Sequence, residues 1–462
     1  MTSQNRTVFA LCVLFAINTM NFLDRQIPGA VGEKIKEEWN LSDKELGFVG
    51  TAFILIYAII GVPLGRLADR SNRSWLLADG VFVWSLLTFG SGLARTFWQM
   101  VAFRLGVGVG EATCAPASNS LIGDLVPASG RARALSLFML GLPIGIALSY
   151  LISTTIAQSP NWGWRYAFYI ALIPGLLCAV AAMFIKEPKR GGSEIHDIGA
   201  HQREGSPYLL VLSIPTMRWI IASGALHNFN MYALGSFLVS FLIRVHGTSI
   251  QQAGLIVMIV YGMAGIPGLF VGGYLGDRII RTRSNGRMLV AAVAIAMTVP
   301  LIYLAIRRPV GDLVVFGVLM GLGCGLMYTY YSTVYATIQD VIEPSLRGTA
   351  MALYFCAMYA LGGALGPYGF GAASDYFAAR AATSSGIELT GLSGDALKEA
   401  LKPFSPDGVW AAMYIIPAVC LVLAIVLFAG SRTVTRDAEK LQRWMRESAA
   451  ASKRAKGAEV PA

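Results

Sequence analysis

The amino-acid sequence predicts an all-α integral membrane protein with twelve spans, folded as two pseudo-symmetric six-helix bundles around a central cavity. Three observations predict this fold class. Of the 462 residues, 55% are hydrophobic and only 14% are charged, whereas a soluble domain averages about 25% charged residues. Apolar segments long enough to cross a bilayer recur along the chain. The two halves also carry similar short sequences at matching positions.

Twelve apolar segments define the expected spans. They cover residues 7–33, 45–65, 75–94, 97–123, 132–157, 165–185, 215–243, 250–275, 287–306, 311–338, 348–377 and 408–430. The longest polar connection on the side of the termini lies between the sixth and seventh spans. We therefore expect an N-terminal bundle over residues 1–186, an inter-bundle loop over 187–213, a C-terminal bundle over 214–431 and a basic tail over 432–462.

The distribution of basic residues predicts the topology. An even number of spans puts both termini on one side, and the loops of that side carry most of the Lys and Arg residues. Positively charged loops stay in the cytoplasm, so we expect both termini there. The compact loops favour a bacterial inner membrane. The net charge of +10 follows from this topology and does not indicate nucleic-acid binding.

The halves repeat each other around their loops. Residues 65–70 (GRLADR) follow the second span and 273–278 (GYLGDR) follow the eighth, while 123–127 end the fourth span as 340–344 end the tenth. Repeats related by an axis along the membrane normal are typical of the two halves of major facilitator transporters, whose substrate site lies near the midplane.

The stretch from Gly65 to Arg73 resembles the loop signature of the major facilitator superfamily, with Asn72 and Ser74 departing from it. In that family the aspartate, here Asp69, caps and pairs with neighbouring helix ends in the outward-open state. The resemblance implies a conformational latch; helix capping and topology alone are the alternative. The latch residues that we predict are Gly65, Asp69, Arg70, Arg73, Asp277 and Arg278.

Two carboxylates and two arginines lie inside the first and fourth spans: Asp24, Arg25, Arg104 and Glu111. A charge at bilayer depth costs at least roughly 3 kcal/mol, so such residues persist where they face a partner or a water-filled cavity. Arg104 and Glu111 are seven residues apart and share nearly one helix face. Helix rise predicts that Asp24 lies level with Arg104, with Glu111 about 10 Å nearer the termini.

These four charges predict a proton switch. Burial disfavours an ionised carboxyl and a nearby guanidinium favours it, so a small rearrangement can change its protonation near neutral pH. We expect Asp24 and Glu111 to exchange protons, while Arg25 and Arg104 act as charge partners or bind an anionic headgroup. A static salt-bridge network between the two spans is the alternative. The second half has no equivalent charges, which favours a coupling role over a scaffold role.

The second half supplies polar and aromatic side chains instead. A tyrosine has an apolar ring and a polar tip, so tyrosines and asparagines together would suit an amphipathic substrate. Packing against neighbouring helices is the alternative role. The candidate cavity residues are Asn21, His227, Asn228, Asn230, Tyr328, Tyr331 and Tyr354.

Residues 21–25 (NFLDR), the stretch 104–112 (RLGVGVGEA) and the loop pair Asp69-Arg70 together resemble the spinster branch of the major facilitator superfamily. Spinster-type proteins move lysophospholipids and sphingoid lipids, and proton coupling is attributed to several of them. The resemblance implies protonatable roles for Asp24 and Glu111, with Arg25 and Arg104 as their charge partners. The same charges also resemble those of proton-coupled symporters of organic anions and sugar acids.

The expected partners are therefore protons, the membrane and an amphipathic small molecule, with no nucleic acid. We expect a monomer that is not an enzyme and uses no cofactor or metal, because the cysteines and histidines show no ligand spacing. A multidrug exporter and a non-transporting receptor are the remaining alternatives.

Overall fold

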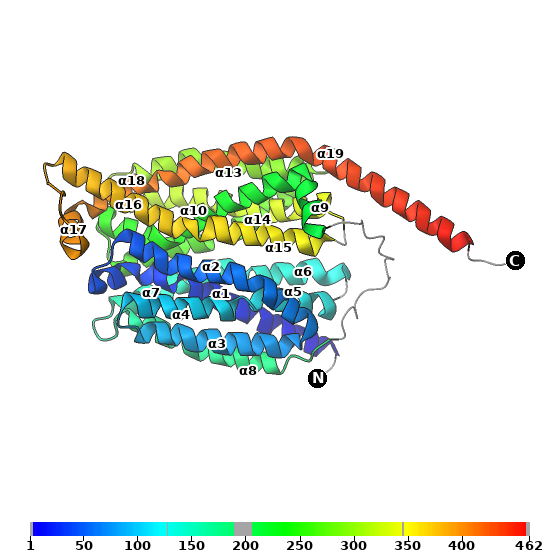
Figure 1. Ribbon diagram of the computed structural model, residues 1–462, viewed down its shortest axis with the longest axis horizontal. Coiled ribbons are helices and arrows are strands. Elements are labelled where there is room, and N and C mark those ends of the chain that lie inside the picture. The colour runs from blue at the N-terminus through cyan, green and yellow to red at the C-terminus, as the bar shows by residue number, and fades with distance from the viewer. Residues whose placement is uncertain (1–2, 127, 189–205, 344–345, 459–462) are drawn as a thin grey trace.

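The computed structural model describes residues 3–126, 128–188, 206–343 and 346–458, and every element in these ranges is a helix. Side chains are described except at 3, 62, 66, 69, 128–133 and 448–458. Figure 1 shows both termini at one end of the molecule, here called the termini end, and α17 at the opposite or far end. The predicted all-helical fold is confirmed.

The first half contains eight helices that make six passes between the two ends. In chain order they are α1 (Ser3–Trp39), α2 (Asp43–Arg70), α3 (Arg73–Leu93), α4 (Phe97–Glu111), α5 (Cys114–Leu125), α6 (Ala128–Met139), α7 (Gly141–Gln158) and α8 (Arg165–Met183). The fourth pass combines α4 with α5, and the fifth combines α6 with α7.

The second half begins with the short helix α9 (Pro207–Ser213), inside the segment expected as the inter-bundle loop. The helices that follow are α10 (Pro215–His246), α11 (Ile250–Val257), η1 (Met258–Met263), α12 (Gly265–Ile279), α13 (Gly286–Ile306), α14 (Leu313–Val341), α15 (Arg347–Ala357), η3 (Met358–Gly363), α16 (Leu365–Ser384), α17 (Gly394–Leu401), η4 (Lys402–Phe404), α18 (Ser405–Met413) and α19 (Ile415–Ala458). Both η1 and η3 are π-helical, whereas η4 is a 3₁₀ turn.

Among the described residues, eleven helical segments are long and apolar enough to cross a membrane. The remaining pass joins α4 and α5, which have 15 and 12 residues and are each too short to cross alone. This pass also carries Arg104 and Glu111, the charges that the sequence analysis singled out. The last helix extends further than expected: α19 continues through the segment taken as a tail, because Ala, Arg, Lys and Glu are strong helix formers.

Proline explains where the passes are interrupted. A proline ring clashes with the carbonyl group four residues earlier and offers no N–H to it. α6 ends four residues before Pro143, η1 before Pro267, η3 before Pro367 and α18 before Pro417. In the same way, Pro116 places the boundary of α4 and α5 at Ala112, directly after Glu111.

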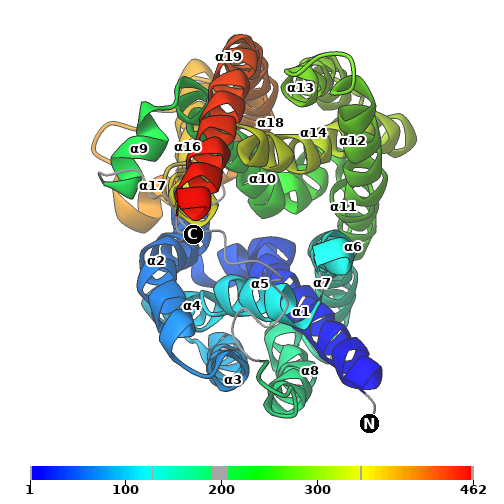
Figure 2. The ribbon, with the colours of Figure 1, turned by 90° about the vertical axis from the view of Figure 1, so that its right-hand side faces the viewer.

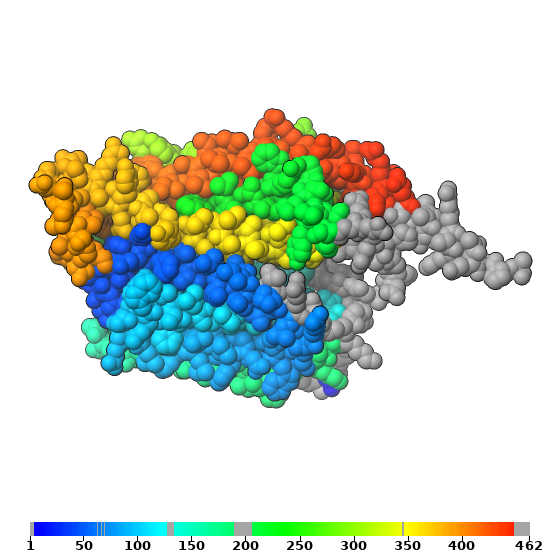
Figure 3. All heavy atoms as spheres, viewed as in Figure 1, coloured from blue at the N-terminus to red at the C-terminus, as the bar shows by residue number. Residues whose placement is uncertain are grey.

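The two halves form separate bundles that meet mainly toward the far end. Figure 2 shows α1–α8 on one side and α9–α19 on the other. Across the interface α2 packs against α16, α1 against α10, and α7 against α11 and η1. α11 and α16 are the far-end parts of their passes, whereas α5, α6 and α12 pack mainly within their own bundles. Figure 3 shows α17 lying against the first half at the far end.

Glycines permit this close contact between the bundles. A Cβ atom on Gly29 would collide with the carbonyl oxygen of Gly235, and one on Gly47 would collide with that of Pro367. Small residues at these positions let helix backbones approach each other closely.

Inside the C-terminal bundle, α12 and α14 make a similar contact that can be tested. A Cβ on Gly268 would collide with the carbonyl of Gly325, whereas Gly317 has open space beside it. We expect Gly268→Ala to cost about 1–3 kcal/mol by overpacking and to lower the midpoint of thermal unfolding in detergent. Gly317→Ala should leave the midpoint unchanged or raise it, because alanine favours helix. Equal midpoints for the two variants would contradict this packing.

Candidate functional site

The buried charges of the first half meet where α1 passes α4. Arg25 Nε donates to Glu111 Oε2 at 2.7 Å, and Asn21 Nδ2 donates to the same oxygen at 2.8 Å. Asn21 and Arg25 are four residues apart on α1, so both side chains lie on one helix face. Asn21, Arg25 and Glu111 are 2%, 8% and 0% exposed, respectively. This contact is therefore an ion pair held away from water.

The position of Glu111 follows from the interruption of the fourth pass. It is the last residue of α4, and the chain resumes as α5 at Cys114. Its second oxygen, Oε1, has no hydrogen-bond partner among the described residues. Oε2 thus accepts both hydrogen bonds, from Asn21 and Arg25, whereas Oε1 accepts none from the described residues.

Aromatic rings surround the Arg25 guanidinium. Its Cζ atom lies 4.3 Å from the ring centre of Tyr57, 5.0 Å from that of Phe22, 5.4 Å from that of Phe53 and 5.9 Å from that of Tyr359. An arginine over aromatic faces gains cation–π attraction, which is strongest where water is excluded. Tyr359 comes from η3 of the second half, so the cage draws on both bundles.

A hydrogen bond also joins this arginine to the second half. Arg25 Nη1 donates to the Tyr232 hydroxyl on α10 at 3.4 Å. The sequence analysis did not identify Phe53, Tyr57 or Tyr232 as site residues. The spacing of Phe53 and Tyr57, four residues apart on the second span, was the available signal for one aromatic face.

The other two charges lie next to this pair but are not joined side chain to side chain. Arg104 Nη1 lies 3.5 Å from the backbone carbonyl oxygen of Asp24, and its Cζ atom lies 4.7 Å from the Phe53 ring centre. Neither carboxylate oxygen of Asp24 has a hydrogen-bond partner among the described residues, although the Trp84 indole lies nearby. Asp24 is fully buried.

The level of a residue and its pairing are separate matters here. Matching depths along ideal helices put Asp24 level with Arg104, and Arg104 lies next to the Asp24 backbone, but the ion pair that forms is Arg25 with Glu111. Depth along a helix fixes the level of a residue but not the direction of its side chain. Adjacent residues on a helix point about 100° apart, so Asp24 and Arg25 face different neighbours.

The predicted polar residues of the second half gather around Tyr331. His227 stacks on Tyr330 with ring centres 4.1 Å apart and meets Tyr331 edge-on at 4.8 Å. The Tyr331 hydroxyl donates to Asn228 Oδ1 at 3.4 Å. Both His227 nitrogens and the Tyr328 hydroxyl lack partners among the described residues.

Two of the predicted residues bond to other neighbours than Tyr331. Tyr354 donates to the Tyr330 hydroxyl at 3.1 Å, within the interior of the bundle. The Asn230 side chain donates to the Ile416 carbonyl at 3.3 Å and to Cys420 Sγ at 3.1 Å, so it is turned toward α19. Tyr328 and Tyr354 are fully buried, so packing describes their present contacts best.

Of the predicted latch residues in the first half, Arg73 is the one with ion pairs among the described side chains. This arginine begins α3 and binds Asp124 Oδ2 at 2.5 Å, Glu187 Oε1 at 2.7 Å and Ser120 Oγ at 2.7 Å. Gly65 lies beside open space and Arg70 is exposed. The Asp69 side chain lies outside the described part of the chain.

The second half repeats this arrangement with a residue that the sequence analysis did not assign to the latch. Arg287 binds Asp277 Oδ1 at 2.7 Å and Asp340 Oδ2 at 2.7 Å, while Arg278 is exposed. The separation in sequence was the available signal: Arg287 precedes its acid by 53 residues, and Arg73 precedes Asp124 by 51.

Within the described residues, no group of three His, Cys, Asp or Glu side chains is arranged to hold a metal ion. The charge cluster itself has two potential anions and two cations in a dry environment. Such a group can bind a proton, which changes its net charge, or exchange one anion for another, which changes the partner of the guanidinium.

Comparisons with known proteins agree with this fold. The sequence profile of the Major Facilitator Superfamily matches residues 14–367. Protein spinster homolog 1 of Mus musculus is 29% identical over 405 residues, covering 81% of this chain and 74% of that protein. An MFS-type efflux pump of Mycolicibacterium smegmatis is 27% identical over 375 residues, covering 79% and 84%, respectively.

A solved structure adds detail to this similarity. The crystal structure of a bacterial homolog to the human lysosomal transporter Spinster, in an inward-facing and unoccupied conformation, matches with a TM-score of 0.82 and 26% identity. The match covers 94% of this chain and 98% of that one. The predicted fold class and the spinster resemblance are both confirmed. The chain belongs to the major facilitator superfamily, with spinster-type transporters among its relatives.

Proposed function

We propose that this transporter moves an amphipathic lipid, of the lysophospholipid or sphingoid-phosphate type, by proton-coupled alternating access. The observation that carries the proposal is the Arg25–Glu111 pair, a buried contact at 2.7 Å that also reaches the second bundle through Tyr232. A change of charge at Glu111 would therefore act on a contact between the two bundles. In this proposal the protein is not an enzyme, and its partners are the membrane, protons and the lipid.

Proton coupling is supported by the missing hydrogen-bond partners of the two buried carboxylates. Burying an ionised carboxylate without hydrogen bonds is costly, whereas the protonated form is tolerated. Asp24 has no hydrogen-bond partner among the described residues, and Glu111 has an unpaired Oε1 beside its paired Oε2. Both groups can accept a proton without first displacing a neighbour.

The proposed cycle depends on whether Glu111 is charged. Protonation of Glu111 removes the charge that holds Arg25 and leaves the guanidinium free for an anionic headgroup. Arg104, next to the Asp24 backbone, supplies the second positive charge of the site. Deprotonation on the other side of the membrane restores the Arg25–Glu111 pair and releases the anion. Alternating access then needs only a rocking of the two bundles about the site.

A lipid is favoured because the surroundings of the site are aromatic. Phe22, Phe53 and Tyr57 flank Arg25, and the tyrosines around Tyr331 extend this apolar wall into the second bundle. An organic anion or sugar acid is the second candidate, because His227 and Asn228 offer unpaired polar atoms for hydroxyl groups. A multidrug exporter is the third, given the efflux pump among the relatives.

The proposed orientation places the termini end in the cytoplasm of a bacterium. Arg73 and Arg287 lie at this end, as do the basic residues of α19, and positively charged loops remain cytoplasmic. The bundles meet at the opposite end, so the described conformation would be inward-facing. We propose that the chain functions as a monomer in the inner membrane.

Proton coupling can be tested in proteoliposomes with an imposed pH gradient. We expect Glu111→Gln and Asp24→Asn each to reduce gradient-driven uptake of a fluorescent lysophospholipid about tenfold or more, since each removes a proton-accepting group. Glu37→Gln is the matched control, because the Glu37 side chain is 70% exposed and pairs only with Lys34 among described residues. Full gradient dependence in both site variants would exclude the proton switch.

The role of Arg25 predicts a difference between arginine and lysine. Lysine keeps the charge but cannot bind a carboxylate or phosphate through a planar fork, and it stacks less well on aromatic rings. We expect Arg25→Lys to raise the KM for the lysolipid about tenfold, with Arg95→Lys as the exposed control. Parallel uptake of a sugar acid by the wild type identifies the substrate class: saturable sugar-acid transport without lysolipid transport would favour the second candidate.

A further inference from the structure

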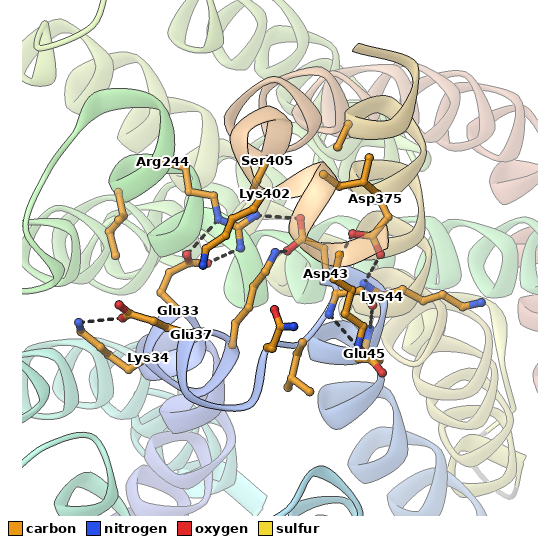
Figure 4. A pocket seen from close by; sticks show the side chains of 18 of the residues that line it. Glu33, Lys34, Glu37, Asp43, Lys44, Glu45, Arg244, Asp375, Lys402 and Ser405 are labelled. Atoms are coloured by element: carbon orange, nitrogen blue, oxygen red, sulfur yellow. Dashed lines mark hydrogen bonds and ion pairs between the residues drawn. The ribbon is translucent and has the colours of Figure 1, made fainter. Parts of the chain in front are cut away.

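The far end holds a second cluster of charges, separate from the site around Arg25. It borders a pocket of about 1080 Å³ between the start of α2, the end of α10 and the segment from α16 to α18. Figure 4 shows Asp43 between Arg244 on one side and Asp375 on the other.

The first turn of α2 is capped in two ways. The first four N–H groups of a helix have no partner within it. Ser42 and Glu45 form a capping box: Ser42 N donates to Glu45 Oε2 at 2.8 Å, and Glu45 N donates to Ser42 Oγ at 3.2 Å. This local motif leaves the N–H groups of Asp43 and Lys44.

Asp375 accepts both of the remaining N–H groups. Asp43 N donates to Asp375 Oδ1 at 3.0 Å, and Lys44 N donates to Asp375 Oδ2 at 2.9 Å. A carboxylate at a helix N-terminus also gains from the helix dipole. Because Asp375 lies on α16 and Asp43 begins α2, this cap joins the two bundles.

Further contacts hold Asp375 in place. The neighbouring Ser374 hydroxyl donates to Asp43 Oδ2 at 2.6 Å, and Arg244 Nη1 donates to the same oxygen at 2.8 Å. A Cβ on Gly371, one turn earlier on α16, would collide with the Asp43 carbonyl oxygen. The start of α2 can approach the interior of α16 this closely only because residue 371 has no side chain.

Arg244 extends the network to α1. It donates through Nε at 3.0 Å and Nη2 at 2.5 Å to the two oxygens of Glu33, in addition to its bond with Asp43. Lys36 also pairs with Asp43. The cross-bundle cap is thus one part of a junction in which cations and carboxylates alternate between the bundles.

We infer that Asp375 is a positioning residue that stabilises the far-end-closed conformation by acting as a second, removable cap of α2. When the bundles separate at the far end, α16 carries Asp375 away from the Asp43 and Lys44 N–H groups. The Ser42–Glu45 box moves with α2 and keeps its own two bonds. The helix therefore survives opening, whereas the contribution of Asp375 is present only in the closed conformation. This inference rests on the alternating access proposed above.

The experiment measures far-end opening directly. Spin labels are placed at Trp162 and Val310, which are 50% and 73% exposed in far-end connections of the first and second halves. The exposed Cys12 and Cys356 are replaced beforehand. Distances are recorded by pulsed electron double resonance in nanodiscs, with neither substrate nor pH gradient. We expect Asp375→Ala to raise the ratio of long to short distances about tenfold, as the loss of two charge-assisted cap bonds implies.

Three further variants separate positioning from general stability. Asp375→Asn keeps the size of the side chain but loses its charge, and should give a smaller shift in the same direction. Glu399→Gln is the control, since Glu399 is also a far-end acid but its side chain is 66% exposed and pairs with Lys402 of the same half; it should give no shift. Ser42→Ala should lower the thermal midpoint without changing the distance ratio, because the local cap is present in both conformations.

Two results would overturn the inference: an unchanged distance ratio in both Asp375 variants, or an equal shift in Ser42→Ala. Lysolipid uptake by the wild type is measured separately. A shift in the Asp375 variants without any lipid uptake would reject the proposed substrate and leave the cap intact, so the two failures are distinguishable.

Discussion

The structure depends on the ion pair between Arg25 and Glu111, because each charge would be intolerable at this depth without the other. Breaking a buried pair by removing one partner typically costs about 3–5 kcal/mol. The pair fixes α1 against α4, and the aromatic rings around Arg25 exclude the water that could replace Glu111. Only another anion, or a proton on Glu111, can release Arg25 at low cost. In the proposed cycle, these are the two events that release Arg25.

The placement of this pair follows from the backbone. In a membrane the main-chain polar groups must be satisfied inside the protein, so an interrupted helix needs neighbours that accept the break. Pro116 interrupts the fourth pass directly after Glu111, and Pro267 and Pro367 adjoin the π-helical turns of the second half. π-Helical turns often lie at functional sites, and the one at η3 supplies Tyr359 to the Arg25 cage.

The sequence was sufficient to predict the helical class, the passes and the charges of the first bundle, because apolar length and buried charge are local properties. It could not predict that Arg25, rather than Arg104, pairs with Glu111, since this depends on the rotation of α1 relative to α4. Nor did it assign Arg287 to the loop network or Asp375 to α2, because both contacts join distant segments. The Tyr57 and Tyr232 contacts were missed for the same reason: an aromatic residue in an apolar span carries no sign of the cation it will face.

The Arg25–Glu111 pair and the far-end junction differ in whether water can replace their contacts. At the far end the pocket is open to water, so the Asp43 and Lys44 N–H groups can exchange Asp375 for solvent, and a helix cap of this kind contributes only about 0.5–2 kcal/mol. Such a contact shifts the equilibrium toward the far-end-closed conformation but cannot prevent opening. The Arg25–Glu111 pair is buried away from solvent, and in the proposed cycle it decides whether the bundles can rearrange. In the proposed mechanism, the buried pair controls the rearrangement of the bundles, and the solvent-exposed cap shifts the equilibrium between the open and closed conformations. Helix α2 takes part in both contacts. Its Tyr57 faces Arg25 at the centre, and the first turn of α2 binds Asp375 at the far end.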